Sequence, residues 1–350
     1  MRILLWHVHG GWTDAFVRGR HEVLLPTLAE RGPWGLGRGG RDWPASAIEV
    51  APDALLDEPV DLVVLQRLEE LELAERLLGR RLGTDVPAVF LEHNTPKPGA
   101  VTTRHPFGDR ADIPIVHVTH FNRLVWDNGD ARSFVIEHGI PDPGYRYTGR
   151  IERMAFVVNE PVRRARVAGT DLLPSFTPVG GVDAFGMGVE QLPSALSADP
   201  SRLSPMGELA TEELHRALAE RRLYLHLARW TSLGLTLLEA MHLGVPVVVL
   251  QTTEASRAVP PGAGFLSTNV DELVSASRLL LEDADAATKI GLAARDAVLE
   301  RYHLDRFLSD WDELAEDLVA RHRRSGRRFA VQAASGFTDG RSDDAYRNGL

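Results

Sequence analysis

The sequence predicts an α/β fold with two domains, each organised around a parallel, Rossmann-like β-sheet. Three observations support this prediction. The chain of 350 residues has the length of about two domains. Continuous apolar, β-branched runs alternate with helical patterns along it, which is typical of parallel strands covered by helices on both faces. Pro141, Pro143 and Gly144 mark a linker between the two halves.

The first half alternates between expected strands and expected helices. The strands are predicted at 2–8, 61–66, 86–92, 113–119 and 134–137, and the helices at 13–31, 68–79 and 120–128. A Gly-rich loop with two tryptophans, 32–46, has no strand before it, so we interpret it as a mobile surface loop and not as a dinucleotide fingerprint. These elements give an N-terminal domain at 1–140 and a linker at 141–152.

The second half continues the same pattern. Strands are predicted at 154–158, 182–187, 224–227 and 246–250, and helices at 211–221, 233–243, 269–282 and 285–302. The C-terminal domain is therefore assigned to 153–303, and a final amphipathic helix is expected at 304–322. The segment 323–350 is polar and rich in Gly, Ser and Arg, so we predict a disordered tail.

The stretch Tyr224–Leu250 (YLHLARWTSLGLTLLEAMHLGVPVVVL) organises the rest of the chain. It is predicted to form a strand, a loop, a helix and a second buried strand. Ser232 is the expected N-cap, since its hydroxyl can accept a hydrogen bond from a free N–H group of the first turn. The N–H groups at such a helix start carry partial positive charge and favour a phosphate.

Three polar residues interrupt this otherwise apolar helix. Thr236, Glu239 and His242 are spaced three apart and share one edge. Helical side chains lean toward the N-terminus, so Glu239 points back at the loop before the helix. A carboxylate one turn behind an anion site can accept hydrogen bonds from ribose hydroxyls. The alternative is a core helix with one solvent-facing edge, and the spacing alone leaves both interpretations open.

The same stretch resembles the C-terminal signature of retaining GT-B glycosyltransferases of family 4, the glycosyl transferases group 1. Leu237–Val248 matches the second half of that signature closely. The resemblance implies that Glu239 holds the nucleotide ribose. The family's first glutamate, which touches the donor sugar, falls on Thr231, so the charge is lost there but a hydroxyl remains. The nucleotide-sugar site would also include Ser232, Leu233, Gly234 and Leu235.

The resemblance also implies an architecture and an activity. Two Rossmann-like domains would face each other across an interdomain cleft, and the last helix would cross back to the N-terminal domain. The donor would be a nucleotide diphosphate sugar, and the acceptor a small molecule, a glycan or a lipid-linked compound. The acceptor hydroxyl would attack from the front face, so that the anomeric configuration is retained. The transfer would need neither a metal nor another cofactor.

In the N-terminal half, Gly10 and Gly11 form a turn between a strand and a helix, where the backbone can approach a ligand closely. His93 follows a predicted strand at its carboxyl end, where ligands of open α/β sheets bind. The resemblance implies that the two glycines approach the donor phosphates or the acceptor, and that His93 contacts the transferred sugar. The tryptophans of 32–46 could stack on the acceptor. Each position can also be explained as ordinary loop structure.

In the C-terminal half, Arg163, Arg164 and Arg166 follow a predicted strand. Family members grip the diphosphate here with an arginine and a lysine, and Ala168 occupies the lysine position. The three guanidinium groups could supply this charge instead, because their forks suit phosphate oxygens. Arg163 and Arg164 are therefore candidate catalytic residues, and Arg166 is a candidate for donor binding. Gly207 lies where the family places a glycine beside the nucleotide base.

Two other functions remain open. Thr231 and Ala168 depart from the family pattern, so the chain could bind nucleotide sugars without catalysis. It could also be a GT-B epimerase that inverts a free nucleotide sugar. A pyridoxal phosphate sugar phosphorylase shares the architecture but needs a Schiff-base lysine, and Lys97 and Lys289 lie in the wrong contexts.

The composition excludes several classes of protein. A net charge of −10 argues against non-specific binding of nucleic acid. The absence of cysteine excludes disulfides and thiolate metal sites. No apolar run approaches the roughly 20 residues of a membrane span, and the N-terminus has the pattern of a strand and not of a signal peptide. We therefore expect a soluble cytoplasmic protein without a transmembrane segment, and the sequence leaves its oligomeric state open.

Overall fold

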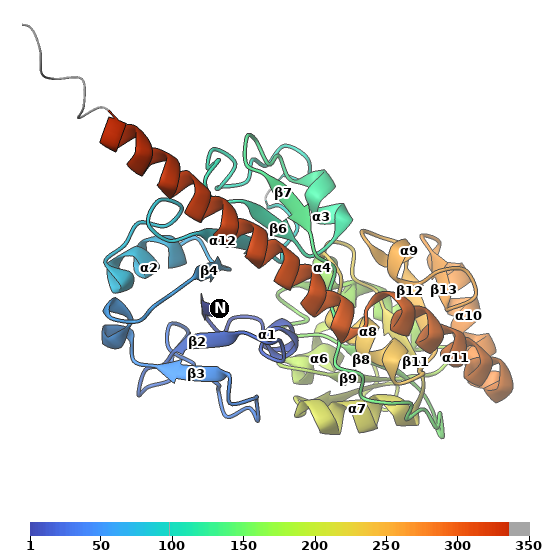
Figure 1. Ribbon diagram of the computed structural model, residues 1–350. Helices are drawn as coiled ribbons and strands as arrows, with labels where there is room; N and C mark the ends of the chain where they lie inside the picture. The colour runs from blue at the N-terminus through green and yellow to red at the C-terminus, as the bar shows by residue number, and fades with distance from the viewer. Residues whose placement is uncertain (98, 336–350) are drawn as a thin grey trace, which may run out of the picture.

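The computed structural model describes residues 1–97 and 99–335 and contains two parallel β-sheets, one in each half of the chain (Figure 1). The N-terminal sheet has seven strands in the order β3-β2-β1-β4-β5-β6-β7, and the C-terminal sheet has six in the order β10-β9-β8-β11-β12-β13. Neighbouring strands pair in parallel throughout both sheets. The predicted class, two Rossmann-like α/β domains, is confirmed.

The N-terminal sheet is buried between layers of helix and loop. Its strands are β1 (Arg2–Leu5), β2 (Glu22–Pro26), β3 (Ala47–Val50), β4 (Leu62–Leu65), β5 (Ala88–Glu92), β6 (Ile115–His117) and β7 (Ser133–Val135). Its helices are α1 (Gly10–Phe16), α2 (Glu70–Leu78) and α3 (His120–Val125), with a 3-10 turn, η1, at Pro52–Leu56. The central strands β4 and β5 are buried along their whole length, as expected for parallel strands covered on both faces.

Strands β2 and β3 differ from the sequence-based prediction. The helix expected at 13–31 ends at Phe16, and residues 23–25 lie in β2, paired with β1 on one side and β3 on the other. A short continuous apolar run carries no period of its own, so a buried strand and a buried helix segment look alike in sequence. Residues 23–25 form a strand here because they are buried and paired between two neighbouring strands.

The Gly-rich loop 32–46 is anchored to the domain, in contrast to the mobile loop that the sequence predicts. Trp43 is 3% exposed, and its Nε1 donates a hydrogen bond to Asp14 Oδ1 at 2.8 Å. The Arg67 guanidinium lies 3.8 Å from the centre of the Trp34 ring. Both tryptophans are thus engaged by their own domain, which removes the basis for expecting them to stack on an acceptor.

The C-terminal sheet carries more helices. Its strands are β8 (Ile151–Val157), β9 (Gly181–Phe185), β10 (Leu203–Gly207), β11 (Arg221–His226), β12 (Val247–Leu250) and β13 (Phe265–Ser267). Its helices are α4 (Ala165–Ala168), α5 (Leu173–Phe176), α6 (Leu192–Ala195), α7 (Thr211–Glu220), α8 (Leu235–His242), α9 (Ala255–Ala258), α10 (Val270–Glu282) and α11 (Ala284–Arg301), with 3-10 turns η2 (Thr170–Leu172) and η3 (Val189–Gln191). Strand β8 begins inside the expected linker 141–152, and β10 and β13 lie where no strand was predicted.

Helix α8 lies in the middle of the C-terminal core. Four of its apolar side chains have no exposed surface, namely those of Leu237, Leu238, Ala240 and Met241. Gly244, with a φ of 82°, follows the helix in the left-handed conformation that glycine tolerates. Gly291 of α11 packs so closely that a Cβ atom there would lie 2.0 Å from the carbonyl oxygen of Gly244. The position of α8 is therefore fixed by the packing around it.

The last helix, α12 (Leu304–Ser335), packs on the N-terminal half, and Figure 1 shows it in red running across that half of the molecule. Trp311 is 3% exposed, and its ring meets those of Trp12 and Phe16 edge-on, with 5.5 and 5.3 Å between ring centres. The tail expected at 323–350 is helical as far as residue 335. Residues 336–350 lie outside the described part of the chain.

We expect Trp311→Ala to lower the free energy of unfolding by about 3–5 kcal/mol, because it removes a large buried side chain and leaves a cavity. Glu313→Ala, on the exposed face of the same helix, should change it by less than about 0.5 kcal/mol. Urea denaturation of the two variants measures both values. Equally small effects would mean that α12 does not stabilise the N-terminal half.

Candidate functional site

A cleft with two adjoining chambers lies in the C-terminal half, and its large chamber extends to the N-terminal half. The large chamber, about 640 Å³ in volume, is lined from the N-terminal half by Gly11, Asp14, Arg18 and Arg41, and from the C-terminal half by residues that include His215, Leu235, Thr236 and Glu239. The small chamber, about 180 Å³, is lined by residues that include Arg164, His226, Thr231 and Gly234. The two share Val157, Asn159 and Thr236, so they are parts of one cleft.

The cleft opens at the carboxyl ends of the C-terminal strands. Val157 is the last residue of β8, Phe185 the last of β9 and His226 the last of β11, and each lines one or both chambers. In open α/β sheets, ligands bind at this edge because the strand ends deliver loops and helix starts to it.

Helix α8 begins at the cleft without a side-chain cap. Its N-cap is Gly234, which has no side chain to offer, and the helix starts at Leu235. Ser232 is therefore not the N-cap that the sequence predicts; it is 6% exposed, and the neighbouring Leu233 packs in the core. A Cβ atom at Gly234 would come within 2.8 Å of the His226 ring, so the loop needs glycine there. The N–H groups of the first turn remain available to an anion.

Glu239 lies one turn further along α8 and lines the large chamber, with 19% of its side chain exposed. Its nearest basic group is His215, whose Nε2 is 3.9 Å from Glu239 Oε1. Burial, together with the charge of Glu239, raises the pKa of the Tyr224 hydroxyl beside it. Glu239 thus places a negative charge in the large chamber, close to the start of the helix.

Of the three candidate arginines, only Arg164 is among the residues that line the cleft. It lines the small chamber, and burial, followed by repulsion from Arg163, lowers its pKa. Among the described residues no carboxylate pairs with it. Arg163 is 73% exposed and pairs with Glu160, and Arg166 is 79% exposed and lies 3.4 Å from Asp171. The prediction that all three face a phosphate therefore does not fit the positions of Arg163 and Arg166.

The two predicted glycine positions bring both halves together. Gly10 and Gly11 are the first residues of α1, and a Cβ atom at Gly11 would lie 2.9 Å from Leu235 Cδ1. The starts of α1 and α8 thus meet across the cleft. Gly207 ends β10 with a φ of 78° and is followed by Glu208 and Leu209, which line the large chamber. Thr231 lines the small chamber, near the start of α8.

His93 is half-buried and is not among the residues that line either chamber. Its ring lies 3.9 Å from that of His9, centre to centre, and its Nε2 is 2.9 Å from Gln66 Oε1. Burial, with smaller effects of His9 and His138, places the pKa of His93 well below its usual value. The ring is therefore neutral at physiological pH.

Two cleft histidines were not singled out from the sequence. His226 lines the small chamber, and burial lowers its pKa to about 4. His215, on α7, lines the large chamber and is 6% exposed. A lone histidine within an apolar strand or on the inner face of a helix is usually a core residue, so only the folded geometry distinguishes these two.

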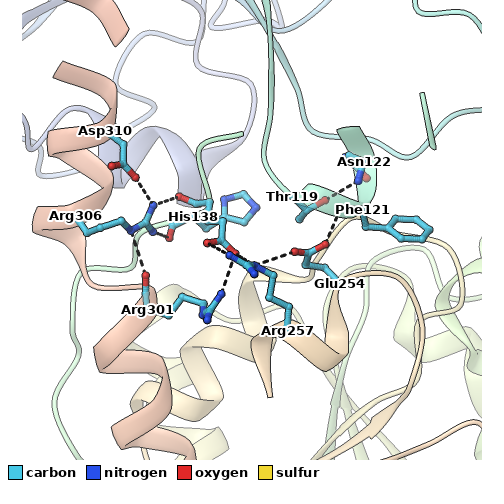
Figure 2. A network of polar contacts seen from close by, with 10 residues as sticks. Thr119, Phe121, Asn122, His138, Glu254, Arg257, Arg301, Arg306 and Asp310 are labelled. Atoms are coloured by element: carbon cyan, nitrogen blue, oxygen red, sulfur yellow. Dashed lines mark hydrogen bonds and ion pairs between the residues drawn. The ribbon is translucent and has the colours of Figure 1, made fainter. Parts of the chain in front are cut away.

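Ion pairs and hydrogen bonds link the two halves of the molecule (Figure 2). Arg257 pairs with Glu137 at 2.8 Å and with Glu254 at 3.5 Å. Glu254 Oε2 accepts a hydrogen bond from the backbone N–H of Phe121 at 2.7 Å. Arg306, near the start of α12, donates to the carbonyl oxygen of Glu137 at 2.9 Å. These contacts fix the relative position of the two sheets.

The described residues contain no group of three or more His, Asp or Glu side chains placed to hold a metal ion. Within the same part of the chain, no helix combines the length and the apolar character needed to span a bilayer.

Two Rossmann-like domains that face each other across such a cleft define the GT-B fold. Residues 203–297, which contain α7, β11, α8 and β12, match the family model described as "Glycosyl transferases group 1". A comparison with curated proteins found no match.

Solved structures with the same fold cover nearly the whole chain. HepE from Anabaena in complex with UDP has a TM-score of 0.66 and 16% identity, over 91% of this chain and 100% of that one. Sucrose-phosphate synthase from Thermosynechococcus elongatus has a TM-score of 0.69 and 13% identity, over 92% and 100%. A glycosyltransferase from Rickettsia africae has a TM-score of 0.66 and 12% identity, over 91% and 98%. At these identities the similarity establishes the fold.

The enclosed histidines predict a pH-dependent stability. Burial, with smaller effects of His9 and Arg306, lowers the pKa of His138 from 6.5 to about 3. Below about pH 6.5 the unfolded chain binds a proton at His138 that the folded chain does not bind. The free energy of unfolding therefore decreases as the pH is lowered from about 6.5 toward 3. From pH 6.5 to 5 the loss at His138 is about 2 kcal/mol.

Chemical denaturation at pH 7.5 and pH 5 checks this prediction. His138→Leu should lose less stability than the wild type over the interval, whereas His120→Leu, at an exposed position, should behave like the wild type. An unchanged pH dependence in His138→Leu would contradict the assignment.

Proposed function

We propose that this protein is a glycosyltransferase that moves a sugar from a nucleotide diphosphate sugar to an acceptor hydroxyl, with retention of configuration and without a metal ion. The observation that carries the proposal is the joint position of three groups at one cleft. The uncapped start of α8 and Arg164 offer positive charge, and Glu239 offers hydrogen-bond acceptors one helical turn away. The matching family model over 203–297 supports the same activity.

The donor would occupy both chambers. Its diphosphate would lie at the small chamber, between Arg164 and the first N–H groups of α8. Glu239 would accept hydrogen bonds from the ribose, and the base would lie beside Glu208 and Leu209, after Gly207. HepE, a structural relative, binds UDP, so UDP sugars are the first donors to test. The acceptor, a small molecule, a glycan or a lipid-linked compound, would enter from the N-terminal half.

The chemistry follows from charge development on the leaving group. As the bond between the anomeric carbon and the diphosphate oxygen breaks, negative charge grows on that oxygen. Fixed donors aimed at it, the Arg164 guanidinium and the N–H groups of α8, would stabilise the transition state more than the ground state. The acceptor hydroxyl would attack from the same face and transfer its proton to the departing oxygen, which retains the anomeric configuration.

Two predicted contacts to the sugar differ in their support. Thr231 lines the small chamber, and its hydroxyl could bond a sugar hydroxyl where the family has a carboxylate. A contact between His93 and the sugar stays a prediction, because the ring packs on His9 and lines neither chamber. The cytoplasmic location also stays a prediction.

The missing carboxylate at Thr231 favours one other function. A chain with the donor site intact but the sugar contact weakened could bind nucleotide sugars without transferring them. Release of nucleoside diphosphate from a panel of nucleotide sugars, measured with and without added acceptors, separates the two. Tight donor binding without release would favour the non-catalytic function, and interconversion of free nucleotide sugars would favour an epimerase.

Glu239→Ala should weaken binding of the nucleoside diphosphate by about 10- to 100-fold, because hydrogen bonds to a charged group contribute roughly 1.5–3 kcal/mol. UDP, GDP and ADP are first screened by thermal shift, and the affinity of the strongest binder is then measured by calorimetry. Glu213→Ala, at an exposed position on α7, is the matched control and should bind like the wild type. A change below twofold in Glu239→Ala, with the fold intact, would remove Glu239 from the site.

Arg164→Ala should lower kcat by about 100-fold or more, since it removes a donor aimed at the leaving group. Arg163→Ala is its neighbour and matched control; Arg163 is exposed and lines neither chamber, so its activity should stay within about twofold. Steady-state release of nucleoside diphosphate measures both. Equal losses in the two variants would contradict the placement of the diphosphate beside Arg164.

A further inference from the structure

His215 has an environment that packing alone does not explain. The residue lies on α7, is 6% exposed and lines the large chamber. Both of its ring nitrogens are buried, and among the described residues neither has a hydrogen-bond partner. The carboxylate oxygen Glu239 Oε1 lies 3.9 Å from its Nε2.

Buried polar atoms without partners destabilise a folded protein, so native structures contain few of them. An apolar side chain of the same size would fill this space without that cost. Glu212, one turn earlier on α7, does not compensate, because it is exposed and pairs with Arg146 at 2.6 Å. The imidazole is therefore better explained by a partner that it acquires when the chamber is occupied.

The carboxylate of Glu239 is equally unrestrained. In the described part of the chain no hydrogen bond reaches its side-chain oxygens, and the gap of 3.9 Å to His215 is about 1 Å longer than a hydrogen bond. A small rotation of either side chain would close this gap. A carboxylate that must align with two ribose hydroxyls gains from such a fixed orientation, because less rotational freedom is then lost on binding.

We infer that His215 is a positioning residue, which donates a hydrogen bond from Nε2 to Glu239 and orients that carboxylate toward the ribose hydroxyls of a bound nucleotide. This inference rests on the proposed function, since it assigns the occupant of the large chamber. His215 and Glu239 together would make the site selective for ribonucleotides over 2′-deoxyribonucleotides. The role is one step removed from the ligand, because His215 acts through Glu239.

The test uses UDP, GDP and ADP and their 2′-deoxy counterparts with the full-length protein. His215→Phe removes the donor but keeps an aromatic ring of similar size, and His215→Gln keeps an N–H donor. His215→Phe should bind the preferred diphosphate about 10-fold more weakly and should lose most of the preference for ribose. His215→Gln should recover affinity to within about threefold of the wild type. Calorimetry gives the affinities.

Two further measurements separate positioning from a structural role. The unfolding free energy of the ligand-free His215→Phe variant should equal or exceed that of the wild type, because two unpartnered nitrogens are removed. In a Glu239→Ala background, His215→Phe should cause little further loss of affinity, since residues that act as one unit are not additive. A lower stability that accounts for the lost affinity, or full additivity of the two substitutions, would overturn the inference.

Failure of the inference and failure of the proposed function give different results. If none of the three diphosphates binds the wild type, both are overturned. If a diphosphate binds and Glu239→Ala weakens it but His215→Phe does not, only the role of His215 is overturned.

Discussion

The structure depends on one arrangement, the uncapped first turn of α8 at the carboxyl end of β11. A helix start with free N–H groups is stable only when water or a ligand satisfies them, and here they face a cleft between two domains. The rest of the C-terminal half holds this turn in place. Strand β12 and the close packing of Gly244 against Gly291 fix the far end of α8, and Gly234 lets the preceding loop pass the ring of His226.

Charge in the cleft is arranged locally and does not follow the overall charge. The chain carries a net charge of −10, yet the small chamber is lined by Arg164, which has no carboxylate partner among the described residues. Its neighbours Arg163 and Arg166 are exposed and lie near the carboxylates of Glu160 and Asp171. Burial lowers the pKa of Arg164. It also strengthens the attraction between this side chain and an anion, because less water screens the charge. The cleft therefore offers positive charge to an anion although the chain as a whole is negative.

How far the sequence predicts this structure can be judged from particular residues. The unit from β11 to β12 was predicted closely because helical and strand periods alternate there and glycine ends the helix. The edge of Thr236 and Glu239 was identified because spacing alone puts both on one side of the helix. Strands β2 and β10 were missed, since short apolar runs and loops with proline and glycine carry no clear period.

Within the site, residue type could be predicted but selection among similar residues could not. Three arginines in four positions fit a phosphate equally well in sequence, and only the turn before α4 decides that Arg164 faces the cleft. Ser232 is a good N-cap by type, but the tight passage at Gly234 moves the helix start two residues along. His215 and Glu239 lie on different helices, so their proximity depends on how α7 packs against α8.

A crystal structure of the protein with a bound nucleoside diphosphate tests the central claim most directly. The account predicts the two phosphates against the N–H groups of Leu235 and Thr236, beside Arg164, with the ribose hydroxyls at Glu239. A diphosphate bound elsewhere, with the start of α8 occupied only by water, would contradict it.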